Sequence, residues 1–146
     1  MLDGEGSEDM LARPTVSVIV PTLNEEEYLP KLLECLLRQS YPCLEIIVAD
    51  AGSCDHTQDI AVRYGCTLVH GGTVAEGRNA GAAVATGDFL CFMDSDVLVD
   101  DEFLKEAIEE IVTRSLEAAA CPVVPITGEH FVRFAYTKEA VFCATI

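Results

Sequence analysis

Short apolar runs alternate along the chain with segments in which apolar residues recur at helical spacing. The runs are rich in β-branched residues and bounded by Pro, Gly or Asp, which is typical of strands buried on both faces. They predict strands over residues 15–20, 45–50, 66–70, 89–93 and 119–124. The intervening segments predict helices from Asn24 to Leu37 and over residues 55–64, 74–85 and 100–116. This order favours an α/β fold with a mostly parallel, Rossmann-like sheet flanked by helices.

The two ends of the chain depart from this alternation. Residues 1–14 hold four acidic side chains and no basic region before an apolar core, which predicts a flexible acidic tail rather than a signal peptide. Residues 126–146 carry Phe131, Phe134 and Phe142 at roughly helical spacing and predict a helix. The single domain is therefore expected over residues 15–125. Because the chain ends within an apolar stretch, we expect it to be part of a longer protein.

Charge and cysteine content narrow the classes of partner. Nine Lys and Arg against 25 Asp and Glu give a formal charge of −16, which argues against nucleic acid or an anionic membrane as a non-specific partner. A phosphate-bearing ligand would need a metal ion, a helix N-terminus or a well-placed Arg. The seven cysteines are odd in number and form no C-x-x-C pair, which predicts free thiols in a reducing, cytoplasmic compartment. No apolar window is long enough to predict a transmembrane segment.

Polar clusters follow three of the predicted strands directly. They are residues 21–25, 50–53 and 94–96. In an open parallel sheet, ligands bind outside the carboxyl ends of the strands. We therefore expect the three clusters to meet in one crevice.

Asp94 and Asp96 are the candidate metal ligands. Carboxylates at positions i and i+2 leaving a strand point to the same side, and at a separation of about 4 Å they repel by about 4 kcal/mol at an effective dielectric of about 20. A divalent cation removes this repulsion, and hard oxygen ligands suit Mg²⁺ or Mn²⁺. The alternative interpretation is two solvated loop acids or a helix cap.

Three further residues are candidate ligand contacts. Asp50 and Glu25 could accept hydrogen bonds from a base or a ribose, or could instead form turns and helix caps. Arg78 lies in Gly77–Gly81, where small neighbours would let a ligand approach, although a surface role is equally compatible with the sequence. The chain has neither a P-loop nor a G-x-G-x-x-G motif after its first strand, which argues against the nucleotide-binding classes that use them.

Taken together, these segments resemble family 2 glycosyltransferases of the GT-A fold. The resemblance runs from about Val16 to Leu116, with the order and spacing of the motifs preserved. The matching segments are VSVIVPTLNE (16–25), EIIVADAGSCDHT (45–57), GRNAG (77–81), ATGD (85–88) and FMDSD (92–96).

The resemblance implies a nucleotide-diphosphate sugar donor, UDP- or GDP-linked, transferred with inversion to an acceptor hydroxyl or a lipid phosphate. It places Pro21, Glu25 and Asp50 in the nucleoside pocket and Arg78 on the nucleotide. It assigns Asp94 to the D-x-D acid nearer the ribose and Asp96 to the metal. The same motifs contribute the remaining substrate-binding candidates, which are Thr22, Asn24, Gly52 and Ser95.

The chain also departs from the family pattern. Ala51 stands where the family often has a second Asp, which leaves base selectivity open. Only 50 residues follow Asp96, and Glu129, the acid at a suitable distance, matches no base motif, so the catalytic base is unassigned.

Several alternatives therefore stay open. One is a non-catalytic half-domain that binds a sugar nucleotide or a partner. Another is a haloacid dehalogenase-type phosphotransferase, although Leu98 occupies its Thr/Val position and its motif belongs after the first strand. A peripheral acceptor at the cytoplasmic membrane face and self-association through the apolar tail are further hypotheses.

Overall fold

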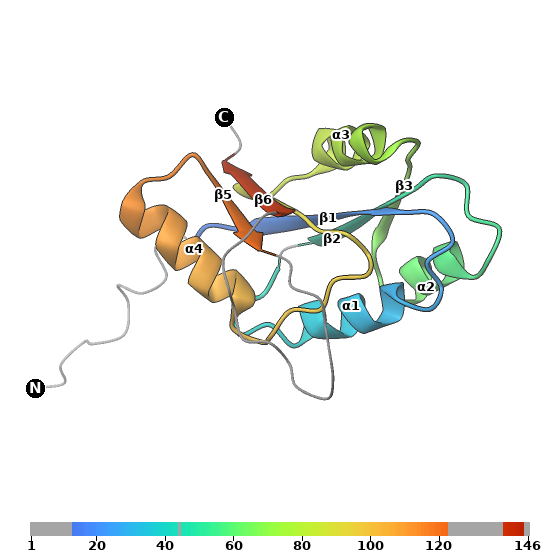
Figure 1. Ribbon diagram of the computed structural model, residues 1–146, viewed down its shortest axis with the longest axis horizontal. Helices are drawn as coiled ribbons and strands as arrows, with labels where there is room; N and C mark the ends of the chain where they lie inside the picture. Colours follow the sequence, from blue (N-terminus) through green and yellow to red (C-terminus); the bar gives the residue numbers. More distant parts are fainter. Residues whose placement is uncertain (1–12, 44, 123–138, 145–146) are drawn as a thin grey trace, which may run out of the picture.

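The computed structural model describes residues 13–43, 45–122 and 139–144, which form a three-layer α/β fold around one mixed sheet. The strands are β1 (Val16–Thr22), β2 (Glu45–Asp50), β3 (Thr67–His70), β4 (Phe89–Phe92), β5 (Ala118–Pro122) and β6 (Glu139–Ala144). The helices are α1 (Leu29–Leu37), α2 (Thr57–Arg63), α3 (Val74–Val84) and α4 (Phe103–Arg114). In Figure 1, α3 lies on one face of the sheet and α1, α2 and α4 lie on the other.

The sheet has the strand order β3-β2-β1-β4-β6-β5. The first four strands in this order are parallel, whereas β6 runs antiparallel to both of its neighbours, β4 and β5. The predicted α/β class and mostly parallel sheet are therefore confirmed. The predicted strands and helices are all present with small shifts of their ends, except at the two places described next; residues 123–124 of the last predicted strand lie outside the described residues.

The helix expected to begin at Asn24 instead begins at Leu29. Asn24 has a left-handed backbone with φ 54°, and its Oδ1 accepts a hydrogen bond from the Cys54 backbone N–H at 2.8 Å. Its backbone N–H in turn donates to Ser53 Oγ, at 2.8 Å. Contacts with the loop after β2 thus replace the expected capping role.

The helix expected over residues 126–146 is wrong for residues 139–144, which form strand β6. The helical spacing of apolar residues is outweighed by pairing with two strands, because β6 satisfies backbone groups along both β4 and β5. Phe142, for example, pairs with Cys91 on one side and Ala119 on the other. The acidic segment 1–12, together with Glu129, Phe131 and Phe134, lies outside the described residues.

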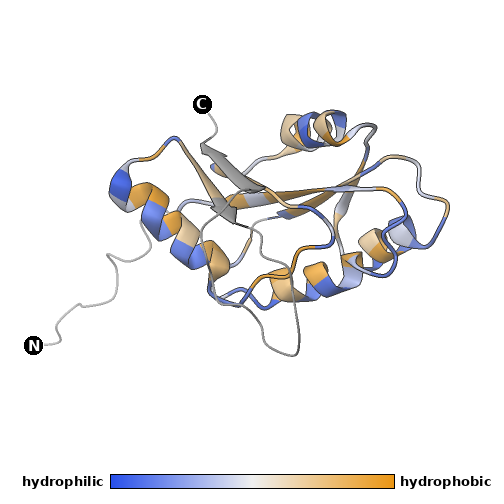
Figure 2. Ribbon diagram, viewed as in Figure 1, coloured by the Kyte–Doolittle hydropathy of each residue, from blue (hydrophilic) through white to orange (hydrophobic). Residues whose placement is uncertain are grey.

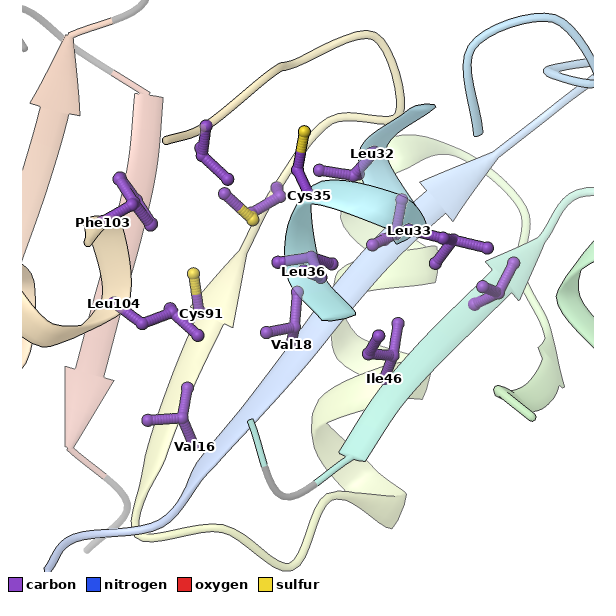
Figure 3. Packing of buried hydrophobic residues seen from close by; sticks show 14 of the residues in the cluster. Val16, Val18, Leu32, Leu33, Cys35, Leu36, Ile46, Cys91, Phe103 and Leu104 are labelled. Atoms are coloured by element: carbon purple, nitrogen blue, oxygen red, sulfur yellow. The ribbon is translucent and has the colours of Figure 1, made fainter. Parts of the chain in front are cut away.

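The core is divided by the sheet into two apolar clusters. Alternate residues of β1 face opposite sides, so Val16, Val18 and Val20 pack in the larger cluster and Ile19 in the smaller one. Figure 3 shows the larger cluster, in which Leu36 of α1 lies over Val18. Both α1 and α4 alternate hydrophobic and hydrophilic residues along their length (Figure 2), as expected for helices with one buried face.

Two further features bear on the sequence-based expectations. Cys35, Cys43, Cys54, Cys66 and Cys91 are all free thiols. Within residues 13–43, 45–122 and 139–144, no helix is long and apolar enough to cross a membrane.

Candidate functional site

The three polar clusters predicted to meet do follow neighbouring strands at the carboxyl edge of the sheet. The β1–β2 register pairs Thr22 with Asp50, and Thr22 Oγ1 donates to Asp50 Oδ1 at 2.9 Å. Phe92, the last residue of β4, pairs with Ile19, so Asp94 lies just beyond the end of the adjacent strand. The short connections after β1, β2 and β4 therefore surround one edge.

Asp50 is the most heavily bonded side chain at this edge. It is 3% exposed, and its carboxylate accepts five hydrogen bonds, from Thr22 Oγ1, Gly52 N–H, Ser53 N–H, Ser53 Oγ and Gln58 Nε2. Burial by itself would raise the pKa of Asp50, but the bonds from Ser53, Gln58 and Thr22 outweigh it and hold the pKa below its ordinary value. Gly52, with φ 92°, supplies the left-handed turn that lets the chain fold back onto the carboxylate.

The loops after β1 and β2 are joined by a second set of bonds that the sequence did not reveal. Glu25 N–H donates to Thr57 Oγ1 at 2.8 Å, and Thr57 is fully buried. Glu26 N–H donates to Asp55 Oδ2 at 3.1 Å, while Glu26 Oε2 accepts from His56 N–H at 3.0 Å. The available signal was the Asp55-x-Thr57 spacing, in which Thr57 N–H donates to Asp55 Oδ1 as in an Asx turn.

Arg78 is carried to the site by α3, which lies unusually close to the sheet. A Cβ on Gly81 would come within 2.4 Å of Ile19 Cγ2, and a Cβ on Gly77 would touch Pro21 and Ala49 at 3.4 Å. A capping box formed by Thr73 and Glu76 fixes the start of the helix. The two buried glycines thus seat α3 on β1 and β2 and hold Arg78 beside the end of β4.

Arg78 contacts Asp94 directly. Arg78 Nη2 lies 3.3 Å from Asp94 Oδ1, with the side chains 33% and 40% exposed. Arg78 Nε is buried and has no hydrogen-bond partner among the described residues. Leaving such a donor unsatisfied costs about 1–3 kcal/mol, so the free protein holds Arg78 in an incompletely satisfied position.

The two acids of the D-x-D segment have different surroundings. Asp94 is held by Arg78, and Ser95 between the two acids is buried. Asp96 is exposed and has no hydrogen bond or ion pair with any other described residue. In the part of the chain that the structure describes, no three His, Cys, Asp or Glu side chains are grouped as metal ligands. Among the described residues, a metal at Asp94 and Asp96 would therefore have these two carboxylates as ligands.

The ATGD segment has a structural role at the opposite edge of the sheet. Glu45 Oε1 accepts from Ser17 Oγ at 2.7 Å and from the N–H and Oγ1 of Thr86 at 2.6 and 3.0 Å. Asp88 Oδ2 accepts from the N–H and Oγ1 of Thr15, both at 2.8 Å. These bonds tie the starts of β1, β2 and β4 together, at the amino ends of the strands.

Comparison with known proteins gives a consistent result. The family model described as "Glycosyl transferase family 2" matches residues 17–142. The glycosyltransferase EpsJ of Bacillus subtilis, itself uncharacterised, is 30% identical over 115 residues, covering 74% of this chain and 33% of that protein.

Two solved structures illustrate the fold relationship. TarS of Staphylococcus aureus in complex with UDP-GlcNAc has a TM-score of 0.69 and 30% identity, over 82% of this chain and 37% of that chain. A mannosyltransferase from Pyrobaculum calidifontis, in complex with GDP-Man and Mn²⁺, has a TM-score of 0.68 and 29% identity, over 77% and 36% of the two chains. The chain thus spans about a third of the length of these proteins.

Proposed function

Because the chain belongs to glycosyl transferase family 2, we propose that the carboxyl edge of its sheet binds the nucleotide-diphosphate sugar of a transfer reaction. The observation that carries this proposal is the meeting of Arg78 and Asp94 beside the fixed Thr22–Asp50 pair. It joins a guanidinium group, which binds phosphate through charge-assisted hydrogen bonds, with carboxylates suited to a metal and to a nucleoside. Family membership also removes the phosphotransferase alternative.

Each side chain has a proposed role in binding the donor. Pro21, Glu25 and Asp50 line the nucleoside pocket, where the five bonds on Asp50 hold its carboxylate in one orientation. Arg78 binds the diphosphate, and Asp94 lies toward the ribose. Thr22, Asn24, Gly52 and Ser95 shape the pocket through the turns and bonds of the two loops.

A divalent cation fits the donor set at Asp94 and Asp96. Mg²⁺ and similar ions are commonly held by one or two carboxylates plus substrate phosphates, rather than by a complete protein cage. Such a cation, when bound, neutralises charge that develops on the departing diphosphate. The mannosyltransferase complex with GDP-Man and Mn²⁺ supports this assignment.

The nucleotide base and the transfer step remain proposals about the whole protein. TarS is in complex with UDP-GlcNAc and the mannosyltransferase with GDP-Man, so both UDP and GDP are candidate nucleotides. We propose an inverting transfer to a hydroxyl or a lipid phosphate, with a base that the described residues do not identify. An acceptor at the membrane surface is compatible with this proposal.

Thermal unfolding of the purified chain with UDP or GDP, each with and without Mn²⁺, tests donor binding. A ligand at 100 times its Kd adds about 2.7 kcal/mol of stability, which raises the Tm of a domain this size by several degrees. We expect one nucleotide to do so only with Mn²⁺. Asp96→Asn should abolish the shift.

The matched control is Asp101→Asn, which removes an exposed carboxylate beside Arg38 rather than beside the site. It should leave the Tm shift intact. The absence of a shift with every nucleotide would contradict the proposal. Binding without sugar transfer or donor hydrolysis would instead favour a binding module without catalytic activity.

A further inference from the structure

The Arg78–Asp94 pair uses only part of the hydrogen-bonding capacity of Arg78. Nε and Nη2 form one edge of the guanidinium group, and this edge can bind an oxyanion through two parallel hydrogen bonds. In the structure Asp94 contacts Nη2 at 3.3 Å, while the adjacent Nε is buried without a partner. Arg78 and Asp94 are therefore joined by one hydrogen bond, and the Nε half of this guanidinium edge is unused.

The local charge balance explains why such an incomplete pair is kept. The chain has nine Lys and Arg against 25 Asp and Glu. Of the ion pairs between described residues, the one formed by Arg78 involves a carboxylate of the site, whereas the others lie elsewhere on the surface. Without Arg78, Asp94 would have no ion-pair partner among the described residues, while another carboxylate, Asp96, lies two residues away in the chain.

A bound diphosphate would compete with Asp94 for the guanidinium group of Arg78. To offer both Nε and Nη2 to a phosphate, Arg78 must turn from its present position, because Nε is buried there. That movement gives the idle Nε a partner but leaves Asp94 without its cation. A divalent cation, which the donor set of Asp94 and Asp96 fits, can then replace the guanidinium at this carboxylate.

We propose that Arg78 is the resident counter-cation of Asp94 in the ligand-free protein, and that it exchanges Asp94 for the donor's diphosphate when a divalent cation occupies the carboxylate. This inference rests on the proposed donor site. By this exchange Arg78 weakens binding of the metal ion alone, because both compete for Asp94, and strengthens binding of the metal–nucleotide complex. Because coupling between two ligands is reciprocal, the nucleotide strengthens metal binding by drawing Arg78 away from Asp94.

Arg78→Gln gives a test in which two affinities change in opposite directions. Titration of Mn²⁺ alone, followed by the electron paramagnetic resonance signal of free Mn²⁺, should show binding to the variant about fivefold tighter than to the unaltered chain, the upper end for a half-exposed ion pair. Calorimetric titration of UDP and GDP in the presence of Mn²⁺ should show nucleotide binding roughly tenfold or more weaker, because charge-assisted bonds to phosphate are lost.

Three further variants separate the exchange from general effects of charge. Arg38→Gln removes a cation paired with Asp101 at 3.5 Å, away from the site, and should leave the Mn²⁺ affinity unchanged. Arg78→Lys keeps a positive charge near Asp94 and should keep Mn²⁺ binding close to its original strength. Asp94→Asn in the Arg78→Gln background should remove the gain, which would assign the gain to this carboxylate.

The outcomes distinguish this inference from the proposed function. If nucleotide binds with Mn²⁺ but Arg78→Gln leaves the affinity for Mn²⁺ alone unchanged or lower, the exchange is wrong and the donor site stands. If Mn²⁺ binding tightens but no nucleotide binds any variant, Arg78 is the counter-cation of Asp94 without serving a donor, and the exchange is again overturned. Undetectable Mn²⁺ binding in both chains overturns it as well.

Discussion

At the scale of single residues, Asp50 shows how one carboxylate can organise a site. Its five donors come from β1, from its own turn and from α2. An amide in its place would offer an N–H₂ group to some of these donors. We therefore expect Asp50→Asn to lower the free energy of unfolding by about 2–3 kcal/mol, measured by urea denaturation.

This destabilisation should depend on pH in a defined direction. The folded pKa of Asp50 lies below its ordinary value of 3.8 because the bonds from Ser53, Gln58 and Thr22 outweigh the opposing effect of burial. The ionised carboxylate therefore stabilises the fold above the ordinary pKa, and this contribution is lost as pH falls through the folded pKa. The difference in free energy of unfolding between the unaltered chain and Asp50→Asn should be largest above about pH 5 and should become smaller below it. A difference that does not change with pH would contradict the stabilising role of the ionised Asp50 carboxylate. Asp59→Asn, on the exposed surface of α2, is the control for loss of a negative charge.

Residue identity was easier to predict than residue partnership. The positions of Asp50 and Asp94 at strand ends follow from the hydrophobic pattern, because strand ends define the binding edge. The hydrogen bond that Glu25 N–H donates to Thr57, and the one that Cys54 N–H donates to Asn24, link residues about 30 positions apart. No local preference encodes such contacts, so the start of α1 was misplaced.

At the scale of elements, α3 acts as the support of Arg78. Gly81→Ala would place a Cβ 2.4 Å from Ile19 Cγ2 and force the helix away from β1. Although alanine favours helix formation by about 1 kcal/mol over glycine, overpacking costs about 1–3 kcal/mol. We expect a net loss of stability and, because Arg78 moves with the helix, weaker nucleotide binding in calorimetric titration.

Ala83→Gly is the matched control for this helix. Ala83 lies on the exposed side of α3, so the substitution should cost about 1 kcal/mol of stability through helix propensity. It should leave nucleotide affinity unchanged, since the contact between α3 and β1 is preserved. An equal loss of nucleotide affinity in Gly81→Ala and Ala83→Gly would show that the stability of α3, rather than the position of Arg78, controls binding.

The same scale shows where periodicity misled the sequence analysis. The tail has apolar residues at helical spacing, yet residues 139–144 form β6 between β4 and β5. A short apolar segment is compatible with either element, and the open edges of its neighbours decide between them. The parallel strands β1 to β4 were predictable because each is followed by its own helix, whereas β6 depends on partners distant in sequence.

At the scale of the whole molecule, the Glu45 cluster and the proposed metal- and phosphate-binding groups lie at opposite ends of the strands. The Glu45 cluster joins the amino ends of the strands, and Arg78, Asp94 and Asp96 lie beyond their carboxyl ends. Both clusters belong to segments that resemble the family, so the motifs alone did not distinguish them. The direction of the strands distinguishes the two clusters, because one lies at their amino ends and the other beyond their carboxyl ends.

Two substitutions at opposite edges should therefore have complementary effects. Glu45→Ala leaves Ser17 Oγ and the Thr86 N–H without their acceptor, which should lower the free energy of unfolding by about 1–3 kcal/mol without changing the affinity for nucleotide and Mn²⁺. Asp96→Asn removes an exposed charge close to Asp94, so stability should stay constant or rise slightly, while metal-dependent nucleotide binding is lost. Denaturation and calorimetry on both variants measure the four quantities. Loss of nucleotide affinity in folded Glu45→Ala would mean that the two edges are coupled through the sheet, and the separation of roles would then be wrong.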